Sequence, residues 1–413
     1  MHIILFEDAY VSQLSPATTA RPAFSLNVGT YSMIELMRSF NCPIEVITRP
    51  HLREITRLSG FDIWQAENGN ERKGPVLILN ARAVPHIGLL SEIKQIINAG
   101  QQGVCRSGKS VVCAYLTTNP LPPRSIGGSQ LLGFIDDLHL EPMKMNIPLL
   151  EYAHDLVRYQ MRIFNDNIQQ RIKNGNYTEI SDGVFVGENV KIGQYFVTDT
   201  SDGPILIESD ASIGPFCYLH GPIYIGRKSR VIEYAHLKEF VTVGRCSKIG
   251  GEVEASIIED YSNKQHHGFL GHSYLGSWIN LGAGTCNSDL KNTYGEVAIE
   301  YHGRKINTGM QFIGCTIGDY SKTAINTSIF TGKTIGVCSM VYGFVTTNVP
   351  SFVNYARSFD QVTEATVDVM IQTQARVFKR RNVQQRPCDI QLIRDMYDLT
   401  QHERQLANEP LSL

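Results

Sequence analysis

A period of six dominates the hydrophobic pattern in the middle of the chain. Every sixth residue of one run is Ile, Leu or Val, and four of these eight positions are followed by Gly: Ile207, Ile213, Leu219, Ile225, Val231, Leu237, Val243 and Ile249. An α-helix repeats near 3.6 residues and an exposed strand near two, so neither gives this period. A parallel β-helix does, because each unit is a short strand and a bend, with the aliphatic residue pointing into the shaft.

The same stride continues on both sides of this run. It begins at Val186, resumes after a shift of two at Ile257, and reaches Phe269, Leu275 and Leu281 before it returns between residues 317 and 341. Roughly 165 residues therefore follow one rule, that of a hexapeptide-repeat solenoid. An ordinary β-sandwich would instead place turn signals about every 8 to 12 residues.

Three parts follow from this pattern. Residues 1–177 alternate short apolar strands with amphipathic helices, which predicts an α/β domain with a mainly parallel sheet, ending in a linker helix over 149–173. Residues 178–350 form the predicted β-helix, and residues 351–413 a helical C-terminal extension with helices near 360–380 and 389–405. Because the last coil of a solenoid exposes an apolar end, we expect a tail helix to cover it.

Composition narrows the function classes. The net charge of −2 gives no reason to expect nucleic acid or an anionic membrane as a partner. The first residues lack the basic and apolar segments of a signal peptide, and no apolar run is long enough to span a bilayer. The nine Cys are scattered singly with no C-x-x-C pair. This favours reduced thiols and a cytoplasmic protein.

The largest irregularity of the repeat runs from Tyr261 to Gly295, and we expect a loop that leaves the shaft from Cys286 onward. Loops on a rigid scaffold often carry active sites. His266 and His267 come first in this segment, and a neutral imidazole can take a proton from an amine. The alternatives are that both are solvent-exposed loop residues, or that they bind a metal with His272. The usual Cys or carboxylate ligands are missing nearby.

The run Gly282-Ala283-Gly284-Thr285 is the second candidate feature. Small residues allow a ligand to approach the backbone, and N–H groups there could hold an anion or an oxyanion. Tight packing between coils would demand the same residues. The run alone does not separate these interpretations.

The segment HHGFLGHSYLGSWINLGAGTCNSDLKN resembles the acetyltransferase part of the bacterial N-acetylglucosamine-1-phosphate uridylyltransferase/glucosamine-1-phosphate N-acetyltransferase family. It is most similar to a branch of sugar nucleotidyltransferase-like proteins with the blocks GGEVEASI, SNK-x-H-x-GFLGHSYLG and NLGAGT-x-x-SDLKN-x-YG. The resemblance implies a left-handed parallel β-helix, a homotrimer, and acetyl-CoA as co-substrate. It also implies the mechanism: His266 deprotonates the amine of an amino-sugar phosphate, which then attacks the thioester.

Site residues follow from the same resemblance. It places substrate contacts at Asn280 and at the aromatic position Phe269, and acetyl-CoA contacts at Ala283, Gly284, Thr285, Asn287 and Lys291. Two positions depart from the family pattern. Phe269 stands where the family has Tyr, and Glu254 where it has a Lys on the sugar phosphate. We expect Lys264 or Lys238 to compensate, or the acceptor to be a different sugar.

The front domain resembles a shortened sugar nucleotidyltransferase, in which Arg21 would bind a phosphate and Asp8 would bind Mg²⁺. The usual Gly-rich loop is replaced by Phe6-Glu7-Asp8. The Asp expected after the later strand is replaced by Asn80. Because Mg²⁺ needs carboxylate and phosphate oxygens, these changes weaken the metal site. An active domain that makes a UDP- or dTDP-sugar and a degenerate domain that binds a nucleotide sugar both remain open.

The resulting hypothesis is a transferase that uses acetyl-CoA to N-acetylate an amino-sugar phosphate or nucleotide sugar, as in UDP-N-acetylglucosamine biosynthesis for cell-wall or surface polysaccharide. Its partners would be small sugar phosphates and nucleotides. The first alternative is a sugar-1-phosphate nucleotidyltransferase whose β-helix only oligomerises it, favoured by Glu254 and Phe269. The second is a non-enzymatic nucleotide-sugar-binding scaffold.

Overall fold

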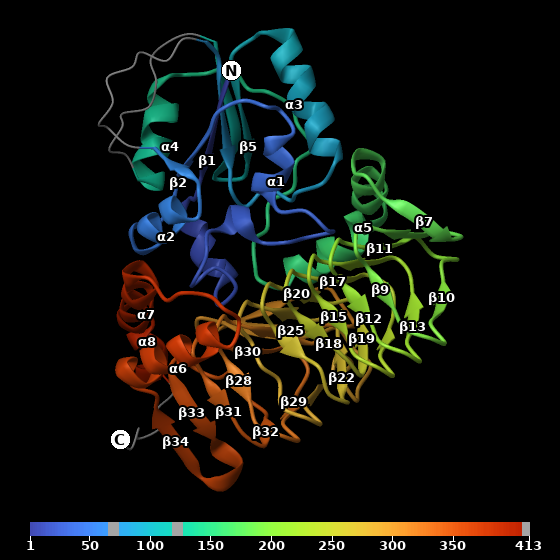
Figure 1. Ribbon diagram of the computed structural model, residues 1–413. Helices are drawn as coiled ribbons and strands as arrows, with labels where there is room; N and C mark the ends of the chain where they lie inside the picture. Colours follow the sequence, from blue (N-terminus) through green and yellow to red (C-terminus); the bar gives the residue numbers. More distant parts are fainter. Residues whose placement is uncertain (65–73, 118–126, 407–413) are drawn as a thin grey trace. The chain divides into compact units, whose positions relative to one another are not determined.

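The computed structural model describes residues 1–64, 74–117 and 127–406 (Figure 1). The chain divides into two compact units. The first contains Met1–Leu14, Arg21–Leu26 and Tyr31–Tyr152, and the second contains Ser15–Ala20, Asn27–Thr30 and Ala153–Leu413. The second unit therefore includes two short segments from the front of the sequence.

The first unit is built on a six-stranded sheet in the order β3-β2-β1-β4-β6-β5. Its strands are β1 (His2–Phe6), β2 (Ile44–Ile47), β3 (Asp62–Ile63), β4 (Val76–Asn80), β5 (Gly103–Ser107) and β6 (Ser110–Leu116). The first four are parallel, as expected, whereas β5 and β6 are antiparallel. The sheet is thus mainly parallel, as predicted, and only β6 runs against its neighbours β4 and β5. A tight turn joins β5 to β6, whereas a parallel pair would need a long crossover.

The first unit contains the predicted helices between its strands, among them α1 (Met33–Arg38) and α3 (Gly88–Ala99). Ser32 begins α1 with a capping box, since its hydroxyl accepts from Glu35 N–H and the Glu35 carboxylate accepts from Ser32 N–H. The remaining helical segments are η1 (Ala9–Leu14), η2 (Ala23–Ser25), η3 (Pro50–Leu52), α2 (Arg53–Leu58) and α4 (Gly128–Asp137).

The second unit is dominated by a parallel β-helix, so the predicted fold class is confirmed. Its first face is a nine-stranded sheet of β7 (Thr178–Ser181), β8 (Val184–Val186), β11 (Ile205–Ile207), β14 (Ile223–Ile225), β17 (Val241–Val243), β20 (Ile257–Ile258), β23 (Tyr274–Leu275), β27 (Cys315–Ile317) and β30 (Lys333–Ile335). Its second face contains β10 (Val197–Asp199), β13 (Tyr218–His220), β16 (His236–Leu237), β19 (Glu252–Glu254) and β22 (Phe269–Gly271).

The third face contains β9 (Lys191–Ile192), β12 (Ser212–Ile213), β15 (Arg230–Val231), β18 (Lys248–Ile249) and β21 (Asn263–Lys264). The later coils add a three-stranded sheet of β24 (Cys286–Asn287), β29 (Ser328–Ile329) and β32 (Phe344–Val345), and a sheet that begins with β28 (Lys322–Thr323) and β31 (Met340–Val341). Aliphatic side chains from all three faces form one continuous core. The hexapeptide stride predicts this core because each sixth side chain points inward.

Coil length explains where the stride shifts. Ile205 pairs with Ile223 in the regular part of the shaft, whereas Thr242 pairs with Ile257, so the later coil is shorter by half a hexapeptide unit. This shorter coil changes which residues point inward. Ile258 and Leu270 join the core, and Lys264 is buried between them in sequence. The predicted inward position of Phe269 is therefore wrong: its side chain is only half-buried, and Leu270 takes its place.

A long excursion interrupts the shaft after β24. Tyr274 pairs with Thr316, so this coil is more than twice as long as the one from Ile205 to Ile223. The added chain contains the antiparallel hairpin β25 (Ala298–Tyr301) and β26 (Arg304–Asn307). The hairpin contacts the residue just before the linker helix in the second unit, since the Tyr301 hydroxyl lies 3.0 Å from His154 Nδ1.

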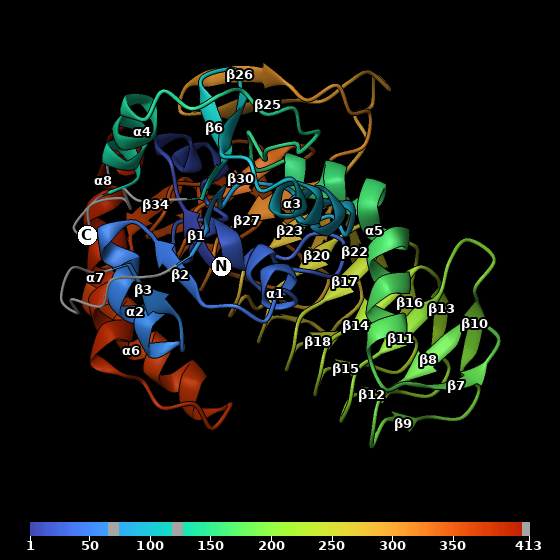
Figure 2. The same cartoon turned by 90° about the horizontal axis from the view of Figure 1, so that it is seen from above.

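The linker helix α5 (Asp155–Asn174) packs on the first face of the β-helix, and Figure 2 shows it running beside β8, β11 and β14. Phe164 and Ile168 contact Leu206 in a separate apolar cluster. A front segment is bound to the same unit, since the Asn27 backbone and side-chain amides both donate to the buried Glu259 carboxylate, at 3.0 and 2.6 Å.

The C-terminal extension contains helices in both expected regions, but a hairpin precedes them. It begins with the hairpin β33 (Val353–Ala356) and β34 (Gln361–Glu364), which are joined by η4 (Arg357–Phe359) and followed by α6 (Val367–Lys379), α7 (Pro387–Leu399) and α8 (Gln401–Leu406). The hairpin closes the end of the core with Val353, Tyr355 and Val362, so a strand has the role expected of a helix. Helix α6 packs on the side of the shaft, where Phe378 lies 4.4 Å from Trp278 between ring centroids. In the described ranges, no helix is both long and apolar enough to cross a bilayer.

Candidate functional site

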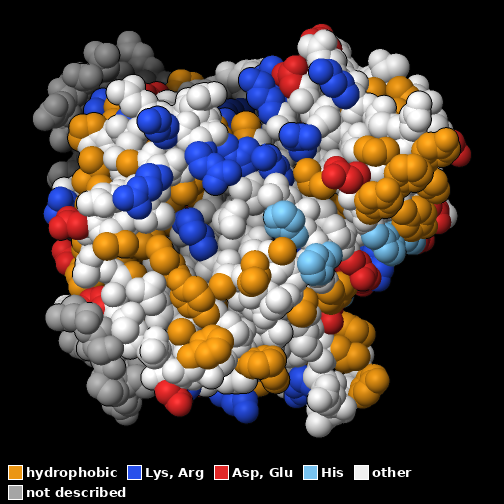
Figure 3. Space-filling view, turned by 60° about the horizontal axis from the view of Figure 1, so that its bottom comes forward, with side chains coloured by type: hydrophobic (Ala, Val, Ile, Leu, Met, Phe, Trp, Pro, Cys, Tyr) orange, Lys and Arg blue, Asp and Glu red, His pale blue; other side chains and the backbone are white. Residues whose placement is uncertain are grey.

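His266 and His267 lie in a bend between β21 and β22, and both side chains are exposed. Histidine side chains also reach the surface, beside apolar ones, in the face drawn in Figure 3. The bend is fixed by its backbone: Lys264 Nζ donates to the His266 carbonyl at 2.7 Å, and Gly284 N–H donates to the His267 carbonyl at 3.1 Å. His266 Nε2 lies 3.1 Å from the Gln265 side-chain nitrogen. An exposed imidazole on a rigid bend can accept a proton from a bound amine.

Lys264 supports this bend from inside the wall of the shaft. Its side chain is buried, and its ammonium donates to the carbonyls of Gly250 and His266, at 2.8 and 2.7 Å. Burial lowers the pKa of Lys264 to about 8. Its predicted contact with a sugar phosphate stays a prediction, and in this conformation the ammonium is directed at carbonyl groups of its own chain. Of these two carbonyls, that of His266 belongs to the bend.

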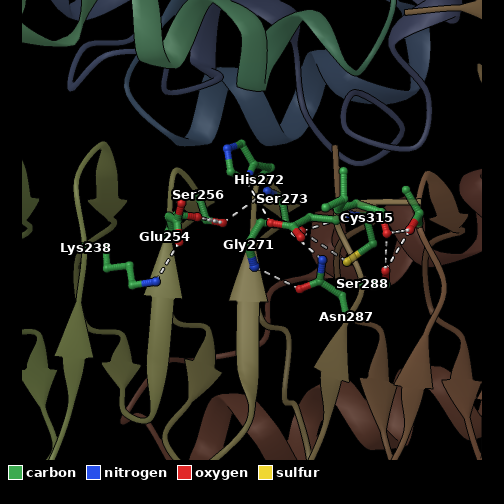
Figure 4. Close-up of polar contacts among 12 residues, drawn as sticks. Lys238, Glu254, Ser256, Gly271, His272, Ser273, Asn287, Ser288 and Cys315 are labelled. Carbon is green, nitrogen blue, oxygen red and sulfur yellow. Dashed lines mark hydrogen bonds and ion pairs between the residues drawn. The ribbon is translucent and has the colours of Figure 1, made fainter. Parts of the chain in front are cut away.

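The second face carries a row of polar side chains next to this bend. Strand register places Glu252 beside Phe269 and Glu254 beside Gly271. Lys238 Nζ lies 2.7 Å from Glu252 Oε1 and 3.0 Å from Glu254 Oε2, and Figure 4 shows the second of these pairs. The carboxylates of Glu252 and Glu254 raise the pKa of Lys238. Lys238 therefore lies at this face with its charge balanced by two carboxylates, and its contact with a sugar phosphate stays a prediction.

Asn280 lies on the third face, on the other side of the bend. It is exposed, forms bridges to Asn263 and Lys322, and its Oδ1 accepts from Asn263 Nδ2 at 3.3 Å. Asn287, predicted near acetyl-CoA, is buried. Its side-chain amide pairs with the backbone of Gly271: Oδ1 accepts from Gly271 N–H at 2.9 Å, and Nδ2 donates to Gly271 O at 3.0 Å (Figure 4). Lys291 lies in the excursion, where its Nζ donates to the Glu296 carbonyl.

Packing between coils accounts for the Gly282–Thr285 run. A Cβ at Gly282 would lie 2.5 Å from the Ala324 backbone, and one at Gly284, whose φ is +75°, would lie 2.1 Å from Asn326 Oδ1. Thr285 is buried against Thr323, with 2.7 Å between the hydroxyl oxygens. Both glycines are thus required by the neighbouring coil, and no open cradle lies at either. Ala283 is half-buried.

One pair near the site was missed by the sequence reasoning. His272 Nδ1 lies 2.8 Å from Asp289 Oδ2, and the His272 ring stacks on Phe312 with centroids 5.4 Å apart. In the sequence, His272 is a candidate only as a metal ligand. The missed signal was the spacing, because Asp289 follows His272 by nearly the length of one coil, which stacks two residues at the same corner. Within the described ranges, no group of three or more His, Cys, Asp or Glu could hold a metal ion.

The two front-domain candidates lie in the first unit. Asp8, predicted to bind Mg²⁺, is fully buried and forms an ion pair with Arg82, with 2.7 Å between Oδ2 and Nη2. Arg21 is half-buried, and its carbonyl accepts from Arg49 Nη2 at 3.0 Å. The residues at Asp8 do not fit a divalent cation, because a guanidinium already occupies its carboxylate. The expected role of Asp8 as a Mg²⁺ ligand therefore does not fit the ion pair at this position.

Comparison with known proteins identifies the front of the chain. Residues 3–174 match the family model described as sugar nucleotidyl transferase. This part of the chain is therefore similar in sequence to sugar nucleotidyl transferases. The match extends through α5, and so it spans segments of both structural units.

Similar curated proteins combine this activity with a second one. A bifunctional sugar-1-phosphate nucleotidylyltransferase/acetyltransferase of Sulfurisphaera tokodaii is 32% identical over 159 residues, which are 38% of this chain and 37% of the relative. The bifunctional protein GlmU of Thermotoga maritima is 28% identical over 196 residues, which are 46% of this chain and 36% of the relative. The predicted resemblance is confirmed. The chain spans well under half the length of these relatives.

Among solved structures, the Francisella novicida UDP-N-acetylglucosamine acyltransferase is similar at 16% identity and a TM-score of 0.29, covering 56% of this chain and 81% of that one. The polysialic-acid-specific acetyltransferase NeuO is similar at 18% identity and a TM-score of 0.19, covering 42% of this chain and 82% of that one.

Proposed function

We propose that the β-helix of this chain transfers an acetyl group from acetyl-CoA to the amine of a sugar phosphate or nucleotide sugar. The observation that carries the proposal is the fixed bend that presents His266 at the edge of the second face. The similarity to bifunctional nucleotidylyltransferase/acetyltransferases supports the same reaction. In cells we expect a cytoplasmic homotrimer, acting on small sugar phosphates and nucleotides.

The chemistry follows from a general base at that position. His266 takes a proton from the sugar ammonium, and the freed amine attacks the thioester carbonyl. A C–N bond forms, the C–S bond breaks, and the departing thiolate receives the proton that the imidazolium holds. His266 then takes the second proton from the attacking nitrogen, which leaves a neutral amide, and releases it to solvent. Coenzyme A and an N-acetyl sugar leave. Ala283 and Lys291 mark the expected acetyl-CoA side of the bend, with Asn280 on the sugar, whereas Gly284, Thr285 and Asn287 would support that side through their packing between coils.

The second face restricts the acceptor. Lys238 is bound by Glu252 and Glu254, so this part of the face has one cation against two carboxylates. A phosphate there would meet like charge, whereas an ammonium would be attracted. We therefore propose that the acceptor's phosphate lies away from this face, as in an amino sugar carried by a nucleoside diphosphate.

The experiment is thiol release from acetyl-CoA by the full-length chain. Acceptors are amino sugars, their 1-phosphates and amino nucleotide sugars, each tested with and without UTP, dTTP and Mg²⁺. We expect thiol release with an amino nucleotide sugar at a kcat/KM at least about tenfold above that of the 1-phosphate, since one repelled charge costs on the order of 1–2 kcal/mol. Absence of thiol release with every acceptor would contradict acetyl transfer, and a preference for the 1-phosphate would contradict the acceptor assignment alone.

A further inference from the structure

The carboxylate of Asp8 is saturated by donors from its own domain. Oδ1 accepts from Tyr10 N–H at 3.1 Å and Arg82 Nε at 2.8 Å. Oδ2 accepts from Asn80 Nδ2 at 2.9 Å and Arg82 Nη2 at 2.7 Å. A carboxylate has about four lone-pair sites, so these four hydrogen bonds leave none for a metal ion. Both Asp8 and Arg82 are buried, which makes the pair costly to separate.

Arg82 is held in place independently of Asp8. Its Nη1 donates to the Leu150 carbonyl at 2.7 Å, and its Nη2 donates to Ser110 Oγ at 2.9 Å. Asn80, at the end of β4, accepts from Arg82 N–H at 3.0 Å through its side-chain oxygen. Its side-chain nitrogen donates to Asp8, and an amide nitrogen that donates is no ligand for a cation. The whole cluster is complementary to one guanidinium.

Glu7, the second carboxylate after β1, is occupied in the same way. It accepts from Ala23 N–H at 2.9 Å, from Thr48 Oγ1 at 2.6 Å, and from Arg49 Nε at 3.1 Å. Burial alone would raise the pKa of Glu7, but the Arg49 charge and these hydrogen bonds together lower it. Glu7 is therefore a buried, ionised partner of Arg49.

The space beside the backbone of these residues is also occupied. A Cβ at Gly128 would lie only 1.8 Å from the Glu7 carbonyl oxygen, so the first turn of α4 packs directly on the chain after β1. The lack of a side chain at Gly128 makes this approach feasible. Helix α4 thus occupies the space at the carboxyl end of β1, where the ligands of open α/β sheets bind.

We propose that Arg82 is a built-in cation in the sugar nucleotidyl transferase domain, and that the Asp8 carboxylate binds no divalent metal ion. In consequence, Asp8 does not support a metal-dependent nucleotidyl transfer. The fixed guanidinium stabilises the chain after β1 instead. This inference is independent of acetyl transfer, because its residues lie in the first unit and the acetyl-transfer residues in the second.

The test is Mn²⁺ binding by the full-length chain, measured as the decrease in the electron paramagnetic resonance signal of free Mn²⁺. Binding is measured without nucleotide and again with UTP or dTTP. Wild type, Asp8→Asn, Arg82→Ala and the exposed control Glu54→Gln are compared, and circular dichroism checks that each variant is folded. We expect Asp8→Asn to leave Mn²⁺ binding unchanged and to lower the melting temperature. Arg82→Ala should gain a Mn²⁺ site that the double variant with Asp8→Asn lacks.

The contrary result is equally distinct. A Mn²⁺ or Mn²⁺–nucleotide site of the wild type that is lost in Asp8→Asn, but kept in Glu54→Gln, would overturn the proposal. If Arg82→Ala does not fold, the comparison of wild type with Asp8→Asn still decides. Pyrophosphate release that depends on Asp8 would contradict the proposal in the same way.

Discussion

At the scale of single residues, the central feature is a lysine where the repeat places an aliphatic side chain. Lys264 is buried at an inward position of the β-helix and holds the carbonyls of Gly250 and His266. A buried ammonium costs free energy even when it is hydrogen-bonded. Its use here fits a role in shaping the bend that carries His266.

Lys264→Met separates this role from stability. We expect kcat for acetyl transfer to fall about 10- to 100-fold, because the bend loses its anchor, with little change in the KM for acetyl-CoA. The folded-state pKa of Lys264 is about 8, below the ordinary value of 10.5. The unfolded state therefore binds more protons between these values, and the free energy of unfolding of the wild type should rise with pH there, relative to Lys264→Met.

Urea titrations at several pH values from 7 to 10.5, together with steady-state kinetics, measure both effects. The variant should keep or exceed the wild-type stability at pH 7. An unchanged kcat would contradict the positioning role, and a stability difference that does not vary with pH would contradict the lowered pKa.

At the scale of elements, α6 shows how the tail contributes. Phe378 packs on Trp278, and Arg381 donates to Asn263 Oδ1 at 2.6 Å, beside β21. Phe378→Ala should cost about 3 kcal/mol of unfolding free energy and increase amide exchange in α6, because a buried ring leaves a cavity. Val369→Ala on the exposed side of the same helix is the matched control. Equal stability of the two variants would show that α6 does not rest on Trp278.

The elements also show how far the sequence could predict the fold. The β-helix followed from its stride, because each inward side chain repeats at a fixed interval. The shift at Ile257 did not follow, since both Ile257 and Ile258 are apolar and only the shortened coil selects Ile258. The β33–β34 hairpin was missed because its alternation is short and lies beside helical sequence.

The site was predictable to a similar degree. The broken repeat and the family resemblance were enough to propose His266. The neutralised charge of Lys238 instead depends on Glu252, which is adjacent only after the coils stack. The carboxylate of Asp8 is occupied by hydrogen bonds from Arg82, which is distant in sequence. Such pairings are set by the fold, and a single sequence carries no local signal for them.

At the scale of the whole molecule, two front segments belong to the second unit. Asn27 binds Glu259, and Gly29 N–H donates to Gln160 Oε1 at 2.7 Å. Contacts between residues so far apart in sequence could not be predicted from local pattern. Part of the sequence that matches the sugar nucleotidyl transferase model, Asn27–Thr30, therefore folds with the unit that contains the β-helix.

The most direct test of the account is thiol release from acetyl-CoA by wild type, His266→Ala and His267→Ala with the preferred acceptor. We predict that His266→Ala lowers kcat by about 10²- to 10⁴-fold, as expected for loss of a general base, while His267→Ala stays within about threefold. Melting temperatures should be equal, because both side chains are exposed. Full activity of His266→Ala, with an unchanged melting temperature, would contradict the central claim.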